Sequence, residues 1–102
     1  MQVRFLAEAA AELDEALTHY QERGDQALAE RMLAQVSGLL DLLAVHPDLG
    51  HVAARGVRRF GLKRFPFDLV YRVDGEQLVV VAVVHHRRKP GFWQTRISPS
   101  GG

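Results

Sequence analysis

The chain has 102 residues and no cysteine, and 47% of its residues are hydrophobic against 25% charged. This excludes a disordered chain, a second domain, disulfide bonds and thiolate metal sites. The net charge of +1 conceals an asymmetry, because residues 1–51 carry three arginines against nine carboxylates (−6), whereas residues 52–102 carry ten lysines and arginines against three carboxylates (+7).

The acidic half predicts a short strand followed by two helices. Apolar and polar residues alternate over Gln2–Leu6, which is typical of a strand. Residues 7–23 are rich in Ala, Glu and Leu with helical spacing, and Gly24 follows as a helix C-terminal residue. Asp25 is placed as the N-cap of a second helix that continues to about Ala44. Since so few residues separate them, the two helices are expected to form an antiparallel hairpin.

The basic half predicts three strands. These are Val57–Phe60, Phe67–Val73 and the β-branched run Gln77–His85, which is expected to be the most buried. Asp74-Gly75 is a strong signal for a two-residue hairpin. We therefore expect an α+β fold of order β-α-α-β-β-β, with an antiparallel meander and the helical hairpin on one face. Residues 1–97 form the expected single domain, and Ser98–Gly102 the expected disordered tail.

Basic residues cluster at three places in the second half. The sequence His85-His86-Arg87-Arg88-Lys89 directly follows the buried strand, and strand alternation would put His85 and Arg87 on one face and His86 and Arg88 on the other. Arg58-Arg59 and Lys63-Arg64 lie on or beside the neighbouring strand. These clusters predict a surface for a phosphate group or an acidic protein segment, since arginine binds both bidentately. The alternative is a solvated surface that only aids solubility.

Other kinds of site have little support in the sequence. Adjacent strand residues such as His85 and His86 point to opposite faces, and no paired carboxylate lies near them, so no metal and no cofactor are expected. There is no Ser-His-Asp pattern and no Gly-rich phosphate loop. The early Glu8 argues against a signal peptide, and the run Leu78–Val84 is too short to span a bilayer. We expect a cytoplasmic protein.

The chain resembles the ParE/RelE superfamily, the toxins of bacterial type II toxin–antitoxin modules that are often labelled plasmid stabilisation proteins. The resemblance covers nearly the whole chain, from about Val3 to Ile97. It is carried by Ala9-x-x-Glu12-Leu13-x-x-Ala16, Leu42-x-x-x-His46-Pro47-x-Leu49-Gly50, residues 56–60, residues 65–73, and residues 83–90 followed by Trp93 and Arg96. The fold that this resemblance implies is the β-α-α-β-β-β arrangement predicted above.

The superfamily has two branches with different activities. RelE-like toxins enter the ribosomal A site and cut mRNA, and ParE-like toxins poison DNA gyrase. RelE-like toxins typically have an arginine inside the strand that reads Phe67–Tyr71 here, where this chain has Asp68. A later arginine is matched by Arg87, and Trp93 stands near the place of their C-terminal tyrosine or histidine. Because a carboxylate would repel the dianionic transition state of RNA cleavage, the resemblance favours the ParE-like branch.

Three activities follow from the resemblance as alternatives. The first is gyrase inhibition by binding, without catalysis. The second is ribosome-dependent mRNA cleavage, for which His85, His86 and Arg87 would be the catalytic candidates. The third is a binding module that only pairs with an antitoxin. In each case the expected partner is a cognate antitoxin in a hetero-oligomer. The expected contact residues, for target or antitoxin, are Arg58, Arg59, Lys63, Arg64, Arg72, Arg87, Arg88, Lys89 and Trp93.

Overall fold

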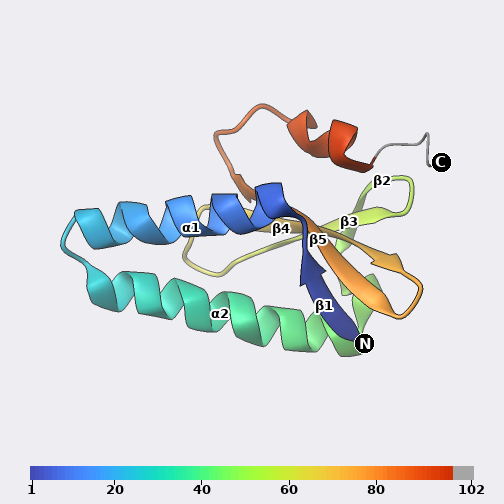
Figure 1. Ribbon diagram of the computed structural model, residues 1–102, viewed down its shortest axis with the longest axis horizontal. Helices are drawn as coiled ribbons and strands as arrows, with labels where there is room; N and C mark the ends of the chain where they lie inside the picture. The colour runs from blue at the N-terminus through green and yellow to red at the C-terminus, as the bar shows by residue number, and fades with distance from the viewer. Residues whose placement is uncertain (98–102) are drawn as a thin grey trace.

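A computed structural model describes residues 1–97 (Figure 1). It confirms the α+β fold and the predicted elements, and adds an unpredicted strand and two short 3-10 helices. The tail 98–102 lies outside the described residues. The elements are β1 (Gln2–Phe5), α1 (Ala7–Glu22), α2 (Gln26–Val45), η1 (Pro47–Leu49), β2 (His51–Ala54), β3 (Val57–Gly61), β4 (Phe67–Asp74), β5 (Gln77–His85) and η2 (Phe92–Ile97).

The five strands form one mixed sheet in the order β1-β5-β4-β3-β2. β1 runs parallel to β5, and the other neighbours are antiparallel, so the predicted meander β3-β4-β5 is confirmed. β5 lies between β1 and β4, and its residues 78–84 are all buried. A strand that is covered on both faces needs apolar side chains in both directions, which explains its continuous β-branched sequence.

The helical hairpin covers one face of the sheet. Asp25 caps α2, since its carboxylate accepts a hydrogen bond of 2.9 Å from the Leu28 amide. Gly24 has a φ of 79°, the left-handed conformation that ends α1 and lets the chain turn back. The core between the helices and the sheet includes Met32, Leu43 and, from the strands, Leu69, Tyr71, Leu78 and Val80. These contacts confirm the helical hairpin on one face.

The opposite face of the sheet is covered by the C-terminal segment. Trp93 in η2 is 2% exposed and packs with Val57, Val70, Val81 and Val84. In Figure 1 η2, drawn in red, lies across the sheet from α2. Both faces of this small sheet are therefore buried, one by the helices and one by a single short segment.

Two details differ from the sequence predictions. The segment His51–Ala54 forms the edge strand β2, because it folds back on β3 through the turn at Arg55-Gly56. β5 ends at His85 and the chain then turns, so the expected alternation of His86 and Arg88 against His85 and Arg87 is wrong. Within residues 1–97 no helix is both long and apolar enough to cross a membrane.

Candidate functional site

Two loops bring most of the predicted basic residues to one end of the sheet. The loop between β3 and β4 and the loop after β5 meet there, since Gly61 pairs with Asp68 and Phe67 pairs with His85. The His86 amide also donates a hydrogen bond of 2.8 Å to the Pro66 carbonyl. We call this surface the cationic end, and its exposed basic residues are Lys63, Arg64, His86, Arg87, Arg88 and Lys89.

The β3–β4 loop is held in place by buried side chains of its own and by a side chain of α2. Leu62 and Phe65 are buried on either side of the two cations. The Gln35 side chain on α2 bonds both main-chain groups of Lys63, because its amide donates to the carbonyl at 2.9 Å and its oxygen accepts from the amide. Arg64 has a φ of 66°, a left-handed conformation that costs a non-glycine residue free energy. The tertiary contacts thus hold Lys63 and Arg64 outward.

A charged network joins the cationic end to the sheet. The two oxygens of Asp68 accept separate hydrogen bonds, from Arg59 Nε at 2.8 Å and from His86 Nε2 at 2.9 Å. A Cβ on Gly61 would lie 2.9 Å from Asp68 Oδ1, so glycine leaves room for this carboxylate. Since the Asp68 carboxylate pairs with Arg59 and bonds His86, it reduces the net positive charge at this point of the surface.

The remaining basic side chains have different surroundings. The Arg88 guanidinium stacks 3.8 Å from the centre of the Phe92 ring. The His85 ring packs edge-on against Phe67, and its Nδ1 accepts a hydrogen bond of 3.0 Å from the Arg87 amide. His85 therefore serves the local backbone, whereas His86 bonds Asp68. The structure separates the two histidines that the sequence offered as equivalent candidates.

Trp93 does not contribute to the exposed surface. Its side chain is buried under η2, and its Nε1 has no hydrogen-bond partner within the described residues. The segment is fixed by Arg96, which bonds Glu12 of α1 through two nitrogens, each at 2.9 Å. This hydrogen bonding raises the pKa of Arg96. The same pair bonds main-chain groups of β5 past Val80, the last β5 residue that pairs with β1. Arg96 donates to the Val81 carbonyl, and Glu12 accepts from the Val83 amide.

Arg58 and Arg72 lie at the opposite end of the sheet. The Arg58 Nη1 donates to two carbonyls of the turn after α2, those of Asp48 at 3.1 Å and Gly50 at 2.8 Å. The Tyr71 hydroxyl donates to the Pro47 carbonyl at 2.6 Å and accepts from the Gly50 amide at 2.9 Å. Burial raises the pKa of this hydroxyl, and the hydrogen bond from Gly50 and the charge of Arg58 offset only part of that effect.

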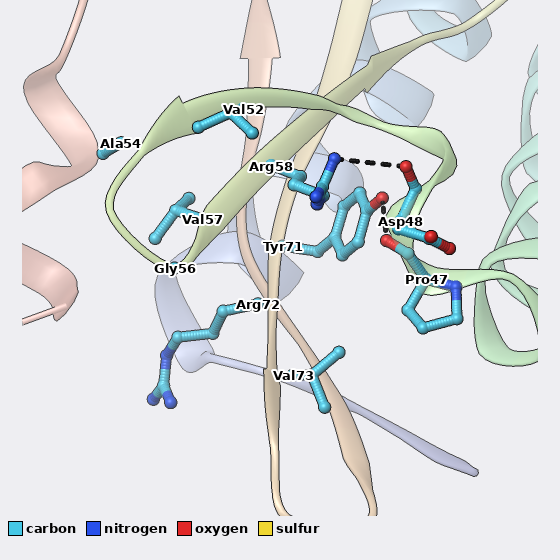
Figure 2. A pocket seen from close by; sticks show the side chains of 10 residues that line it. All are labelled: Pro47, Asp48, Val52, Ala54, Gly56, Val57, Arg58, Tyr71, Arg72 and Val73. Atoms are coloured by element: carbon cyan, nitrogen blue, oxygen red, sulfur yellow. Dashed lines mark hydrogen bonds between the residues drawn. The ribbon is translucent and has the colours of Figure 1, made fainter.

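A pocket of about 350 Å³ opens beside these residues (Figure 2). The predicted contact residues thus fall into three groups: Arg59, Lys63, Arg64, Arg87, Arg88 and Lys89 at the cationic end, Arg58 and Arg72 at this pocket, and Trp93 in the core. The anchoring roles of Tyr71, Glu12 and Arg96 were not predicted. No local sequence signal could have found them, because their partners lie 21 to 84 residues away.

Comparison with known proteins gives a consistent picture. The model of a family described as the ParE toxin of the type II toxin–antitoxin system parDE matches residues 3–90. A solved structure described as the chromosomal ParDE toxin–antitoxin system from P. aeruginosa is similar with a TM-score of 0.71 and 24% sequence identity. The match covers 83% of this chain and 95% of that one, and shows a shared fold. No curated protein sequence matches the chain.

Proposed function

The chain belongs to the ParE toxin family of type II toxin–antitoxin systems, and from this we propose that it is the toxin component of such a module. It inhibits DNA gyrase by binding, without catalysis of its own, and a cognate antitoxin neutralises it. The surface that we assign to gyrase is the cationic end, where six exposed basic residues lie on two loops joined by the hydrogen bond between His86 and Pro66.

The observation that carries the choice of binding over cleavage is the position of Asp68. Cleavage of RNA through its 2′-hydroxyl builds up negative charge on phosphate, which needs free cationic donors in the site. Here the partly buried Asp68 carboxylate lies beside the cations of the cationic end and already bonds Arg59 and His86. Arg59 and His86 are therefore less available to stabilise negative charge on a phosphate. Lys63, Arg64, Arg87 and Lys89 remain exposed and can bind a partner.

Charge supports the proposal of an antitoxin partner. Residues 52–102 carry a net charge of +7, and most of it lies at the two ends of the sheet. An antitoxin with an acidic segment would neutralise this charge and form a toxin–antitoxin hetero-oligomer. Because exposed charges are screened by salt, its association rate should fall as ionic strength rises.

A supercoiling assay with purified gyrase tests the proposed activity. Relaxed plasmid, ATP and gyrase are incubated with increasing amounts of the protein, and the supercoiled product is measured on a gel. We expect supercoiling to be inhibited, and inhibition to be relieved when the antitoxin is added first. Unchanged supercoiling at a large excess of folded protein would contradict the proposal.

Ribosome-dependent mRNA cleavage is the second candidate, and one contact favours it. His86 Nε2 lies 2.9 Å from the Asp68 carboxylate, which only accepts hydrogen bonds, so Nε2 carries the proton and Nδ1 of a neutral ring is free to accept one. An imidazole oriented in this way by a carboxylate is a typical general base. The neighbouring Arg87 would then bind the phosphate.

Primer extension on translated mRNA distinguishes the two candidates. Cleavage predicts new 5′ ends during induced expression, and these should disappear with His86→Gln. Gyrase inhibition predicts no new ends in either case. Growth arrest without either effect would indicate another target, and normal growth would favour a module that only binds its antitoxin.

A further inference from the structure

A second concavity lies beside the cationic end, on the face of the sheet that the helical hairpin covers. We call it the helix-side pocket. One wall is α1 between residues 12 and 20, the other is the turn after β5 at residues 87–88, and the floor includes Phe67, Val83 and His85. Its volume of about 510 Å³ falls within the range of about 300 to 1,000 Å³ that is usual for small-molecule sites.

The floor of the helix-side pocket is aromatic. Phe67 and His85 pair across the β4–β5 ladder, and their half-buried rings meet edge-on with centres 5.0 Å apart. Tyr20 on α1 adds a third ring at the border. Because the chain covers these rings only in part, a flat ring from outside can pack against them. The floor therefore suits an aromatic group of a ligand.

The two walls of the pocket carry opposite charges. On α1 the Glu15 carboxylate is exposed and has no ion-pair or hydrogen-bond partner within residues 1–97, whereas Glu12 is engaged by Arg96. On the turn after β5 the Arg87 guanidinium is exposed and has no partner in the same part of the chain. Since no ion pair joins Glu15 to Arg87, each charge is available to a ligand that lies between them.

His85 adds an oriented hydrogen-bond donor to the floor. Its Nδ1 accepts a hydrogen bond of 3.0 Å from the Arg87 amide, so the proton of the neutral ring is on Nε2. Among the described residues no group accepts a hydrogen bond from that Nε2. The side chain that bonds its own backbone through one nitrogen thus presents the other as a donor beside Arg87, and two donors side by side suit a phosphate group.

We propose that the helix-side pocket binds an adenine mononucleotide, with its base between the two charged walls and its phosphate at the turn after β5. The base packs against Phe67, and its amino group donates to the Glu15 carboxylate. The phosphate accepts hydrogen bonds from the Arg87 guanidinium and from His85 Nε2. This small-molecule site is additional to the proposed function and does not depend on gyrase inhibition.

Other ligands satisfy fewer of these groups. Inorganic phosphate would use Arg87 but leave Glu15 and the aromatic floor without a contact. An aromatic amino acid carries its ammonium and carboxylate groups on one carbon atom, so it would not reach both walls. A metal ion has no support, because within residues 1–97 no three His, Cys, Asp or Glu side chains are grouped so that they could hold one.

The test compares three ligands in two-dimensional NMR titrations of the isotope-labelled full-length protein. AMP is the probe, adenosine lacks the phosphate, and IMP has a carbonyl in place of the amino group. With AMP we expect saturable amide shifts at Glu15, Phe67, His85 and Arg87. Adenosine and IMP should each bind at least about fivefold more weakly, because each loses one of the two polar contacts.

Three exposed residues supply variants that should keep the fold. Arg87→Gln should weaken AMP about tenfold and leave adenosine unchanged, and Glu15→Gln should abolish the preference for AMP over IMP, since an amide can donate to the carbonyl. Lys89→Gln removes a neighbouring cation that does not line the pocket, and it should bind AMP as the wild type does.

Four results would each overturn the proposal. These are no saturable shifts at millimolar AMP, equal weakening of AMP and adenosine by Arg87→Gln, equal weakening of AMP by Arg87→Gln and Lys89→Gln, and tighter binding of a trinucleotide RNA than of AMP. The third would indicate attraction to charge alone, and the fourth a nucleic-acid strand instead of a free nucleotide. Because the titration involves neither gyrase nor toxicity, its failure is distinct from failure of the proposed function.

Discussion

The two ends of the sheet use arginine in opposite ways. At the cationic end the loops are shaped largely by uncharged groups, namely the Gln35 side chain and the main-chain bond between His86 and Pro66. Exposed there are the side chains of Lys63, Arg64, Arg87 and Lys89. At the pocket of Figure 2 the charged side chain of Arg58 itself shapes the turn after α2, by donating hydrogen bonds to the carbonyls of Asp48 and Gly50. A basic residue in the sequence can therefore be a contact or an anchor, and the main-chain groups around it decide which.

This difference suggests a division of roles between the ends. A surface of exposed cations on preformed loops suits fast, salt-sensitive binding of a large partner. The pocket of Figure 2, bordered by the exposed side chains of Val52 and Val73, suits a contact that depends on shape more than on charge. Variants at the two ends should therefore differ in how much they lower stability and in how much they weaken gyrase inhibition.

The largest loss of stability is expected at the ion pair between Glu12 and Arg96, which joins α1, η2 and β5. Glu12→Ala should lower the free energy of unfolding by about 3 kcal/mol, because it leaves Arg96 and the Val83 amide without their partner in a site that is mostly buried. Urea unfolding measures the change. Glu15→Ala, on the exposed side of the same helix, is the control and should stay within about 0.5 kcal/mol of the wild type. Equal effects of the two variants would show that the ion pair does not fix the C-terminal segment.

The next effect concerns the turn after α2, which borders the pocket of Figure 2. Tyr71→Phe should cost about 2 kcal/mol, since it leaves the Pro47 carbonyl and the Gly50 amide unbonded. Burial raises the pKa of Tyr71 in the folded protein, so its contribution is complete below the ordinary value of about 10 and is lost as pH rises through the folded value. The stability difference between wild type and variant should therefore narrow above about pH 10. A difference that stays constant through this range contradicts the assignment.

Arg58 and Arg87 are matched arginines, one at each end of the sheet, with different expected contributions to stability. Arg58→Met should cost about 1.5 kcal/mol, because two carbonyls of the turn lose a charged donor. Arg87→Met should change stability by less than about 0.5 kcal/mol, because its side chain is exposed and no hydrogen bond within residues 1–97 involves its guanidinium. Thermal unfolding of both variants measures the difference. If Arg87→Met were the more destabilising, the roles assigned to the two ends would be reversed.

The smallest effect is expected at Asp68. Asp68→Asn should change stability by no more than about 1 kcal/mol, since its partners Arg59 and His86 are partly or largely exposed. Gyrase inhibition should survive, because the contact cations remain. New mRNA ends that the wild type produces and Asp68→Asn does not would instead identify Asp68 and His86 as a catalytic pair.

The sequence predicted the fold well because its signals are local. Helix caps such as Asp25, the Asp74-Gly75 turn and the apolar run of β5 each depend on neighbouring residues, and the resemblance to toxins joined them in the right order. The strand β2 was not predicted, because four residues without clear alternation become a strand only by pairing with β3.

The surface was harder to predict because its signals are not local. The run 85–89 and the pair Lys63-Arg64 were correctly grouped by the expected meander. Nothing in the sequence distinguishes Arg58 from Arg59, yet alternation sends one to the turn after α2 and the other to Asp68. Trp93 in turn is buried by the turns after His85, which bring it back over the second face.

Whether the cationic end binds gyrase is tested by comparing two triple variants in the supercoiling assay. One removes three positive charges from the cationic end (Arg87→Gln, Arg88→Gln, Lys89→Gln). Its control removes the three positive charges of the acidic half (Arg4→Gln, Arg23→Gln, Arg31→Gln), so that the net charge falls equally. We expect the concentration for half inhibition to rise at least about tenfold in the first and stay near the wild-type value in the second. Equal inhibition by both variants, or none by the wild type, would contradict the claim that the cationic end binds gyrase.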